Sequence, residues 1–295
     1  MRKQASEVRQ PFQFSWEVPE GGYRCELGSA IDAPRGAKPE LMLVEPAPMG
    51  VSRMVRRYQP LNEETGLFRE FAQIKETPEG VIDFANKYGA LGGDKLPQRV
   101  RIPKIDAKGQ PHYEGEPITA WHEEIVSMRR LLQLWDDPIG KREITFRTRT
   151  TPEPENIWAE WSSGSEIVVS GIFDPDTYER FKDKPAGVAE SYLRTKVNAK
   201  LQEHPSTGKL MYERTDRLGL FIVPDSLISA LWLQFAFAID GARKYRSCMN
   251  CKKWFEVGGS VRRADARMCG NNCRAAFAYS KKKKQQGRGR RRNRP

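Results

Sequence analysis

The sequence predicts an α+β fold in which a helix-rich body with short strands precedes a small cysteine-rich module and a basic tail. Segments with helical apolar periodicity recur through the body, and short runs of β-branched and aromatic residues lie between them. Four of the five cysteines lie between residues 248 and 273, shortly before a stretch dominated by Lys and Arg. We expect an irregular N-terminal segment with short strands over 1–60, the α+β body over 61–242, the module over 243–280 and a disordered tail over 281–295.

The clearest helix signal in the body is "TPEGVIDFANKYGALGG", which begins at Thr77. A threonine that can cap the helix, followed by Pro78 in the first turn, is typical of a helix start, and Gly89 can provide the left-handed stop. Apolar residues recur at the i, i+3, i+4 and i+7 positions, namely Val81, Phe84, Ala85 and Tyr88. The segment therefore predicts a helix with one buried face.

Three further helices are predicted over residues 119–135, 187–203 and 226–242. The first has an apolar stripe formed by Trp121, Ile125, Met128, Leu132 and Trp135. The last is apolar on nearly all sides, so we expect it in the centre of the core. Its predicted core residues are Leu227, Ala230, Leu231, Phe235 and Ile239.

Short strands are predicted at Leu41–Val44 and in the segments "EITFRTRT", "NIWAEW" and "EIVVSGIF". The segment "KLMYERTDRLGLFIVPD" has two apolar runs around a polar centre, which predicts a hairpin that turns near Thr215–Asp216. Residues 92–117 are rich in Gly, Pro and charged residues, and we expect them to form an exposed loop.

The charge of the chain is unevenly distributed. The overall net charge is +12, and the segment from Arg243 to Pro295 has eighteen Lys or Arg against only Glu256 and Asp265. That segment therefore carries +16, which leaves the preceding 242 residues at −4. Such asymmetry indicates interaction with a polyanion, either nucleic acid or an anionic membrane surface.

The spacing of the clustered cysteines is typical of a tetrahedral metal site. Cys248 and Cys251 are separated by two residues, Cys269 and Cys273 by three, and the 17 residues between the pairs fit a short hairpin. We therefore predict one structural Zn²⁺ held by these four thiolates. Catalytic dithiol chemistry, unligated thiols and an iron–sulfur cluster are the alternatives, and Cys25 is expected to be a separate free thiol.

Three stretches of the C-terminal part carry a resemblance to a known family. They are "ALWLQFAFAIDGARKYRSCMNCKKWF", "RRADARMC" and "CRAAFAYSKKKK". Together, over about residues 225–284, they resemble the end of bacterial CGNR-type zinc-finger proteins. The family's cysteine pairs are usually more widely spaced, and its Gly-Asn-Arg after the last cysteine is missing here. The resemblance implies a treble-clef-like finger after an α-helical body, and a role in regulating transcription.

We expect the module to bind nucleic acid, with DNA slightly preferred over RNA. The finger would present cations beside the metal, and the tail would add contacts to phosphates without regard to sequence. The predicted nucleic-acid-binding residues are Arg262, Arg263, Arg267, Arg274, Lys281, Lys282, Lys283, Lys284, Arg288, Arg290, Arg291, Arg292 and Arg294.

Two alternative functions remain open at this point. One is a nuclease or toxin-like effector that the finger targets, with Asp174, Asp176 and Glu179 as a carboxylate set that could hold a metal. The other is a protein-interaction adaptor in which zinc is structural and the tail only adds solubility. We find no phosphate-binding loop and no nucleophile elbow, so no catalytic residue is predicted.

The sequence also bears on location. The N-terminal "MRKQASEVRQPFQFSW" contains no apolar stretch typical of a secretory signal. The longest apolar run, Leu227–Ile239, includes Gln234 and is shorter than a membrane span requires. We therefore expect a cytoplasmic protein without a membrane partner, and reducing conditions there favour metal binding over disulfides.

Overall fold

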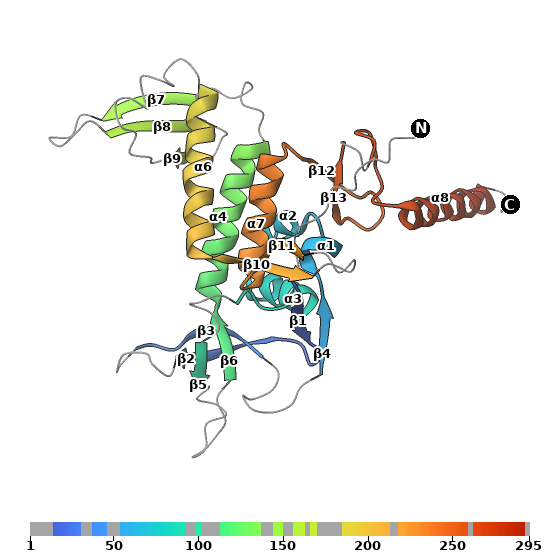
Figure 1. The fold of residues 1–295 in the computed structure, drawn as a ribbon. Helices are drawn as coiled ribbons and strands as arrows, with labels where there is room; N and C mark the ends of the chain where they lie inside the picture. The colour runs from blue at the N-terminus through green and yellow to red at the C-terminus, as the bar shows by residue number, and fades with distance from the viewer. Residues whose placement is uncertain are drawn as a thin grey trace. The chain divides into compact units, whose positions relative to one another are not determined.

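The structure is a computed structural model, and its described residues are 14–30, 37–45, 54–92, 98–101, 113–136, 144–149, 156–162, 166–169, 185–212, 218–258 and 262–292. Its chain forms two compact units. The first combines Met1–Ile125 with His204–Pro295, and the second is Val126–Glu203. The predicted α+β class is confirmed, because helices and short antiparallel strands alternate along the chain (Figure 1). The predicted segment boundaries at residues 60 and 242 stay predictions.

The N-terminal part of the first unit is built from short strands. A small closed barrel has the strand order β2-β3-β6-β5, with β2 at Arg24–Ala30, β3 at Glu40–Val44, β5 at Gln98–Arg101 and β6 at Tyr113–Pro117. A separate antiparallel pair joins β1 (Trp16–Pro19) to β4 (Val55–Tyr58). The strand predicted at Leu41–Val44 is therefore confirmed as β3.

The exposed loop predicted over 92–117 is wrong in part, because β5 and β6 lie within it and pair with each other. Charged residues, Gly and Pro in these strands hide the usual apolar alternation. Glu116 is nevertheless only 1% exposed, and neighbouring N–H groups bind its carboxylate. A strand that buries a satisfied charge has no signature in hydropathy.

Helices fill the rest of the first unit: α1 (Pro60–Glu63), α2 (Leu67–Ala72), α3 (Pro78–Tyr88), the start of α4 (Ile118–Asp136) and α7 (Leu227–Asp240). The predicted cap of α3 is confirmed, since the Thr77 hydroxyl accepts a hydrogen bond from the Gly80 N–H at 3.3 Å. Gly89 ends the helix at φ 95°, in the left-handed region that glycine adopts without strain. All four residues of the predicted apolar stripe of α3 are buried.

Aromatic rings form the centre of the first unit's core. Phe71 of α2 lies 5.5 Å from Phe84 of α3 and 6.2 Å from Trp121 of α4, measured between ring centroids. Phe68 stacks on Phe235 of α7 at 5.5 Å. These contacts join four helices, and each ring contributes a large buried apolar area together with favourable edge or offset geometry.

Helix α7 lies in this core, as the sequence predicts. Leu227, Ala230, Leu231 and Phe235 are almost fully buried, whereas Ile239 near the C-terminal end is half-buried. The helix begins at Ser226, whose hydroxyl accepts a hydrogen bond from the Ser229 N–H at 3.2 Å. Burial on nearly all sides explains why this segment is apolar around its whole circumference.

The predicted hairpin of the first unit is confirmed as β10 (Ser206–Tyr212) paired with β11 (Leu218–Pro224). In the second unit, β7 (Ile144–Arg149), β8 (Asn156–Ser162) and β9 (Glu166–Val169) form an antiparallel sheet in that order. Helix α6 (Pro185–Glu203) follows and has Leu193 and Val197, one turn apart, buried. The described helices include none that is both long and apolar enough to cross a bilayer.

The basic tail differs from the prediction of disorder. Helix α8 runs from Asn271 to Arg292, so the described part of the tail continues the helix that begins at the cysteines (Figure 1). Lys, Gln and Arg are good helix formers, and they are continuous with a turn already fixed by the module. The like charges and the two glycines oppose helix formation, which is why the sequence predicts disorder in this segment. Residues 293–295 lie outside the described chain.

The end of α7 suggests a stabilising substitution. Ala242 adopts φ 44°, a left-handed conformation that costs a residue with a Cβ about 1–2 kcal/mol. Ala242→Gly should relieve this strain and, after the entropy that glycine adds to the unfolded chain, raise the free energy of unfolding by about 0.5–1 kcal/mol. The measurement is the urea midpoint. The control Ala236→Gly, in the interior of the same helix, should lower stability by about 1 kcal/mol. A stability loss at both positions would contradict this account.

Candidate metal centre

The backbone of the module brings the four cysteines together. Strands β12 (Lys244–Ser247) and β13 (Trp254–Val257) form an antiparallel hairpin, and the tight turn between them holds Cys248 and Cys251. Within this turn the Cys248 N–H donates to the Lys253 carbonyl, and the Lys252 N–H donates to the Cys248 carbonyl, both at 2.9 Å. Lys252 adopts φ 66°, which allows the chain to reverse immediately after the second cysteine. Cys273 lies in the first turn of α8.

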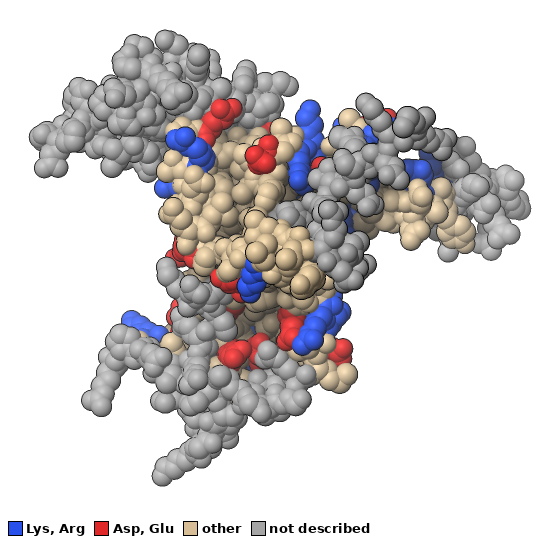
Figure 2. Space-filling model, in the orientation of Figure 1, with Lys and Arg blue, Asp and Glu red and all other residues tan. Residues whose placement is uncertain are grey.

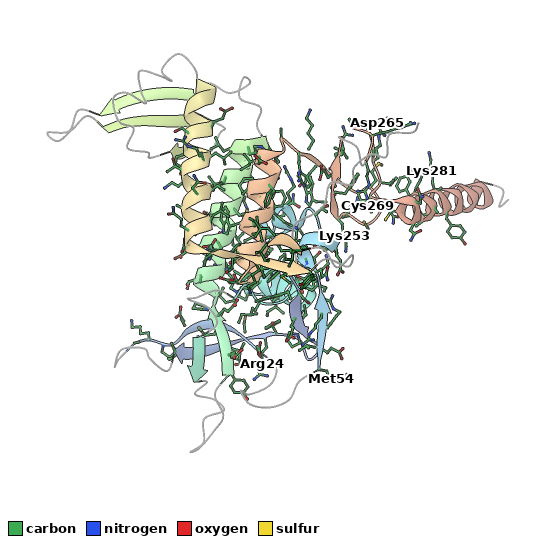
Figure 3. All side chains as sticks on the ribbon, in the orientation of Figure 1. Arg24, Met54, Lys253, Asp265, Cys269 and Lys281 are labelled. Carbon is green, nitrogen blue, oxygen red and sulfur yellow. The ribbon has the colours of Figure 1, made fainter. Side chains whose placement is uncertain are left out.

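The four sulfur atoms converge on one point. All of them lie within 4.8 Å of one another, with Cys251 Sγ 3.6 Å from Cys269 Sγ and Cys269 Sγ 3.3 Å from Cys273 Sγ. Tetrahedral zinc with Zn–S bonds of about 2.3 Å requires sulfur separations of about 3.8 Å. The cluster therefore fits one metal ion and needs only small adjustments. Figure 3 places Cys269 between the β12–β13 hairpin and the start of α8.

The electrostatics of the cluster favour a cation. Burial opposes ionisation of Cys248, but N–H groups of Cys251, Cys269 and Asn250 outweigh it and lower the pKa of this thiol to about 6. Burial raises the pKa of Cys251 and Cys269, and the sulfurs of Cys248 and Cys273 add to both shifts. Because four thiolates cannot share this space without mutual repulsion, a divalent ion is needed to stabilise the fully deprotonated set.

The chemistry of the donors agrees with a structural metal. Four sulfur ligands in a closed set are typical of structural zinc, which would cross-link the hairpin to α8. The four thiols form no disulfide with one another. Cys25 lies apart from them in β2, as expected, and burial, aided by Glu79 and Glu26, raises the pKa of its thiol to about 11.

The module packs against α1 and α2 of the first unit. The ammonium of Lys253 forms an ion pair with the carboxylate of Glu64, and the Trp254 indole N–H donates to Gln73 Oε1 at 3.2 Å. At Gly66 a Cβ atom would approach Trp254 Cβ to 2.6 Å, so only glycine allows the two backbones to lie this close. These contacts begin within two residues of Cys251, so the cysteine-bearing turn and the helices are mechanically linked.

Arg69 is the centre of this contact. Although charged, it is only 6% exposed, and its guanidinium lies 5.2 Å from the ring centroid of Tyr245 in β12 and 5.0 Å from that of Trp254 in β13. It also lies 5.6 Å from the ring of Phe68. Phe68 in turn contacts Tyr245 edge-on at 5.3 Å. Cation–π attraction between desolvated groups of this kind contributes about 2 kcal/mol or more per pair.

The structure places most of the predicted cationic residues on or near the module. Arg263, Arg267, Arg274 and Lys281 are exposed, whereas Arg262 is half-buried with its guanidinium 5.3 Å from the Phe255 ring centroid. The backbone of α8 carries a further group, namely Lys282, Lys283, Lys284, Arg288, Arg290, Arg291 and Arg292. Arg294 lies outside the described residues.

The module carries several exposed cations that have no acidic partner among the described residues. Within the described chain, no salt bridge engages Arg263, Arg267, Arg274 or Lys281. The module has few carboxylates to neutralise these cations. Of its two, Glu256 forms an ion pair with Arg243 at 3.4 Å, and only Asp265 remains. Figure 2 shows Lys and Arg on the described surface of this region, next to the β12–β13 hairpin. The module therefore retains positive charge that is available to an anionic partner.

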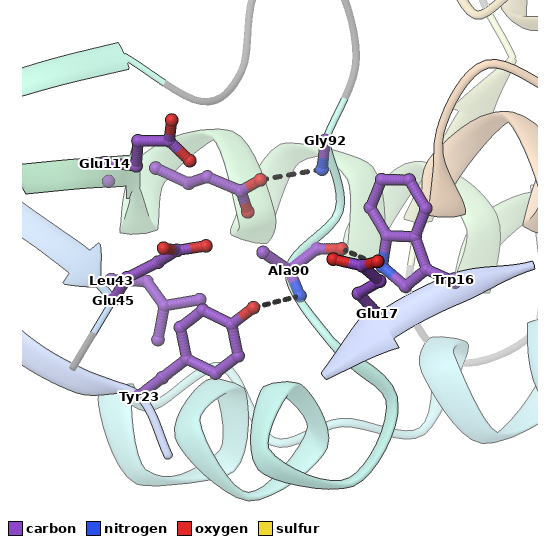
Figure 4. A pocket seen from close by; sticks show the side chains of 10 residues that line it. Trp16, Glu17, Tyr23, Leu43, Glu45, Ala90, Gly92 and Glu114 are labelled. Carbon is purple, nitrogen blue, oxygen red and sulfur yellow. Dashed lines mark hydrogen bonds between the residues drawn. The ribbon is translucent and has the colours of Figure 1, made fainter. Parts of the chain in front are cut away.

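A cavity of about 150 Å³ lies at the other end of the first unit, between the barrel, β1 and the loop after α3 (Figure 4). Its walls include the rings of Trp16 and Tyr23. The Trp16 indole donates to the Ala90 carbonyl at 3.0 Å, and the Ala90 N–H donates to the Tyr23 hydroxyl at 3.2 Å. Four carboxylates line the cavity, those of Glu17, Glu45, Glu114 and Glu116. Phosphate would be repelled there, so the cavity is separate from any polyanion site.

Glu116 explains how this end of the unit is held together. Its carboxylate accepts hydrogen bonds from the N–H groups of Gly92 at 2.7 Å and Leu91 at 3.0 Å, and from the Trp121 indole at 2.7 Å. Burial raises the pKa of Glu116, although these three donors oppose the shift. Sequence reasoning missed this residue, because a glutamate between glycine and proline carries no signal of burial.

The carboxylate set that suggested a nuclease, Asp174, Asp176 and Glu179, lies outside the described residues. The chain matches no protein-family model, no curated protein and no solved structure. The resemblance to CGNR-type zinc fingers therefore rests on residues 225–284 and on the four converging cysteines, which are consistent with a zinc-finger module of unassigned type.

The first prediction from the site concerns metal content. The purified chain should contain one zinc per molecule, and Cys273→Ser should lose most of it, because three thiolates form an open and weaker site. The measurement is elemental analysis after gel filtration. Cys25→Ser, which removes a thiol outside the cluster, should retain the full zinc content. Equal zinc loss in both variants, or none in either, would contradict the assignment.

The second prediction concerns the contact between the module and α2. Gly66→Ala should lower the free energy of unfolding by about 1–3 kcal/mol, since the new Cβ must displace Trp254 and its backbone. Gly208→Ala is the control, because its Cβ would meet only Leu220 Cδ1 at 3.7 Å, an ordinary contact. Urea unfolding followed by tryptophan fluorescence measures both. Matching midpoints for the two variants would show that the module does not pack on α2.

Proposed function

We propose that this protein binds nucleic acid through its zinc module and acts as a DNA-binding regulator of transcription in the cytoplasm. The observation that carries the proposal is the group of exposed, unpaired cations around the thiol cluster: Arg263, Arg267, Arg274 and Lys281. Cations that lack an internal partner cost self-repulsion in the free protein. A phosphate backbone relieves that repulsion and releases its own counterions, which drives association.

Helix α8 strengthens the case for a duplex partner. It contains nine Lys or Arg and no acidic residue, and its 22 residues extend for about 33 Å. This length is close to one turn of B-form DNA, about 34 Å. A continuous basic helix that starts at a metal-fixed turn can follow a groove or a phosphate ridge over this distance.

DNA is preferred to RNA because of the shape of the grooves. The major groove of B-form DNA admits an α-helix, whereas the major groove of A-form RNA is too deep and narrow for one. The rigid module would orient the exposed arginines, and arginine pairs well with guanine edges as well as with phosphate. Base contacts would come from the module, and the C-terminal half of α8 would mainly add phosphate contacts.

The proposal predicts the salt dependence of DNA binding. A triple variant, Arg263→Gln with Arg267→Gln and Arg274→Gln, should weaken duplex binding and flatten the log–log salt slope by about 2 to 3, since each lost phosphate contact contributes about 0.9. The control removes three exposed cations elsewhere, by Lys38→Gln, Lys75→Gln and Lys209→Gln. Fluorescence anisotropy at several salt concentrations measures both slopes on duplex DNA and on single-stranded RNA.

The two triple variants have the same net charge, so a nonspecific charge effect would change their slopes equally. Equal slopes for both variants and the unmodified chain would exclude the module as the binding surface. A third protein, truncated after Ser280, separates the contribution of the tail. If about five tail charges contact phosphates, truncation should flatten the slope by about 4 to 5 and leave any sequence preference intact.

A further inference from the structure

The hairpin β10–β11 has one apolar face that the rest of the described chain leaves open. Leu210 and Leu220 are directly opposite each other in the ladder, and Tyr212 and Leu218 are the next pair on the same face. Their side chains are 72%, 64%, 72% and 62% exposed, respectively. Single exposed apolar residues are common on protein surfaces, but two adjacent cross-strand pairs form a contiguous patch.

The other face of the hairpin is partly covered. Met211, Phe221 and Val223, which alternate with the patch residues, are half-buried, although Thr207 and Lys209 on that face are exposed, and β11 contacts α7 of the core, which follows it in the chain. In the described structure β10 and β11 pair only with each other. A two-stranded sheet is marginally stable unless its apolar surfaces are covered. The contacts with α7 hold the hairpin in place, and the four patch residues on its other face remain exposed to solvent.

We propose that a second copy of this chain covers the patch, so that the protein is a homodimer joined through the outer faces of two β10–β11 hairpins. The four side chains expose on the order of 500 Å² together, more than half of the roughly 800 Å² that each partner contributes to a standard interface. Two such faces bury on the order of 1,000 Å² in total, which is sufficient for a dimer in the micromolar range.

The composition of the patch favours an identical partner. None of the four positions carries a charge, although the chain as a whole has a net charge of +12. Two copies can therefore approach through this face without placing like charges in contact, which the module and α8 would not allow. A face made of three leucines and one tyrosine is also self-complementary, because the leucines of two copies can pack against each other around a two-fold axis. Figure 2 shows a mostly uncharged surface in the area of β10 and β11.

The test is the oligomeric state of the full chain, measured by sedimentation velocity from about 1 to 100 µM after nuclease treatment, so that nucleic acid cannot bridge the molecules. The unmodified protein should convert from monomer to dimer across this range. The double variant Leu210→Ser with Leu220→Ser should remain monomeric, with the dimer dissociation constant raised by about 100-fold or more. The second pair, Tyr212→Ser with Leu218→Ser, should have the same effect.

The matched control replaces exposed apolar residues elsewhere in the same unit. Met54→Ser with Leu27→Ser removes side chains that are 74% and 55% exposed, and this variant should dimerise like the unmodified chain. Melting temperature and zinc content verify that each variant is folded. A monomeric unmodified protein at 100 µM would overturn the proposal, as would a hairpin variant that dimerises normally.

A measurement on the unmodified chain makes the test independent of any variant. Amide hydrogen exchange in β10 and β11 should slow as the protein concentration rises, while exchange in β12, β13 and the start of α8 should not change. If slowing is confined to the zinc module, the copies associate through that module and the hairpin interface is excluded. Dimerisation through the hairpin does not depend on nucleic acid, so its failure would leave the proposed function untouched.

Discussion

The convergence of four sulfur atoms on one point is the constraint on which the C-terminal part of the molecule depends. The module has a small buried cluster, Cys248, Phe255 and Val257, which is too little apolar surface to hold the 38 residues of 243–280 in one conformation. A metal ion held by the four sulfurs would replace the missing core, because binding energy of about 10–16 kcal/mol becomes folding energy in such units. Such a cross-link would fix both the direction of α8 and the placement of the exposed arginines.

The residues next to the thiol cluster fix the module to the rest of the first unit. The turn that carries Cys251 is followed directly by Lys253 and Trp254, which contact α1 and α2. Arg69 then lies against rings from both strands of the hairpin. Because Phe68 beside it stacks on Phe235 of α7, the contacts continue without interruption from the metal site to the aromatic core. Loss of the metal should therefore loosen α2 as well as the module.

Sequence reasoning succeeded where a residue's role is local. The cap at Thr77, the all-round burial of α7 and the paired cysteines each follow from a spacing of a few residues, and all are confirmed. It failed where long-range contacts decide. Glu116 is buried only because N–H groups distant in sequence bind it, and Arg69 only because Tyr245 and Trp254 enclose it. Hydropathy treats both residues as surface charges, so it predicts a loop where β6 lies and gives no sign of the contact between the module and the rest of the first unit.

The helical tail changes how the positive charge can act. A disordered chain of the same composition would lose conformational entropy for each phosphate contact, and it would contact DNA without a fixed direction. In a helix that begins at Asn271, two residues before Cys273 of the thiol cluster, the backbone is already ordered, and a metal ion held by the cluster would set its direction. The nine Lys and Arg positions of α8 are then distributed along about 33 Å of helix axis. The entropy of ordering would then be lost on folding and metal binding rather than on association, so more of the electrostatic attraction would remain to stabilise the proposed complex with DNA.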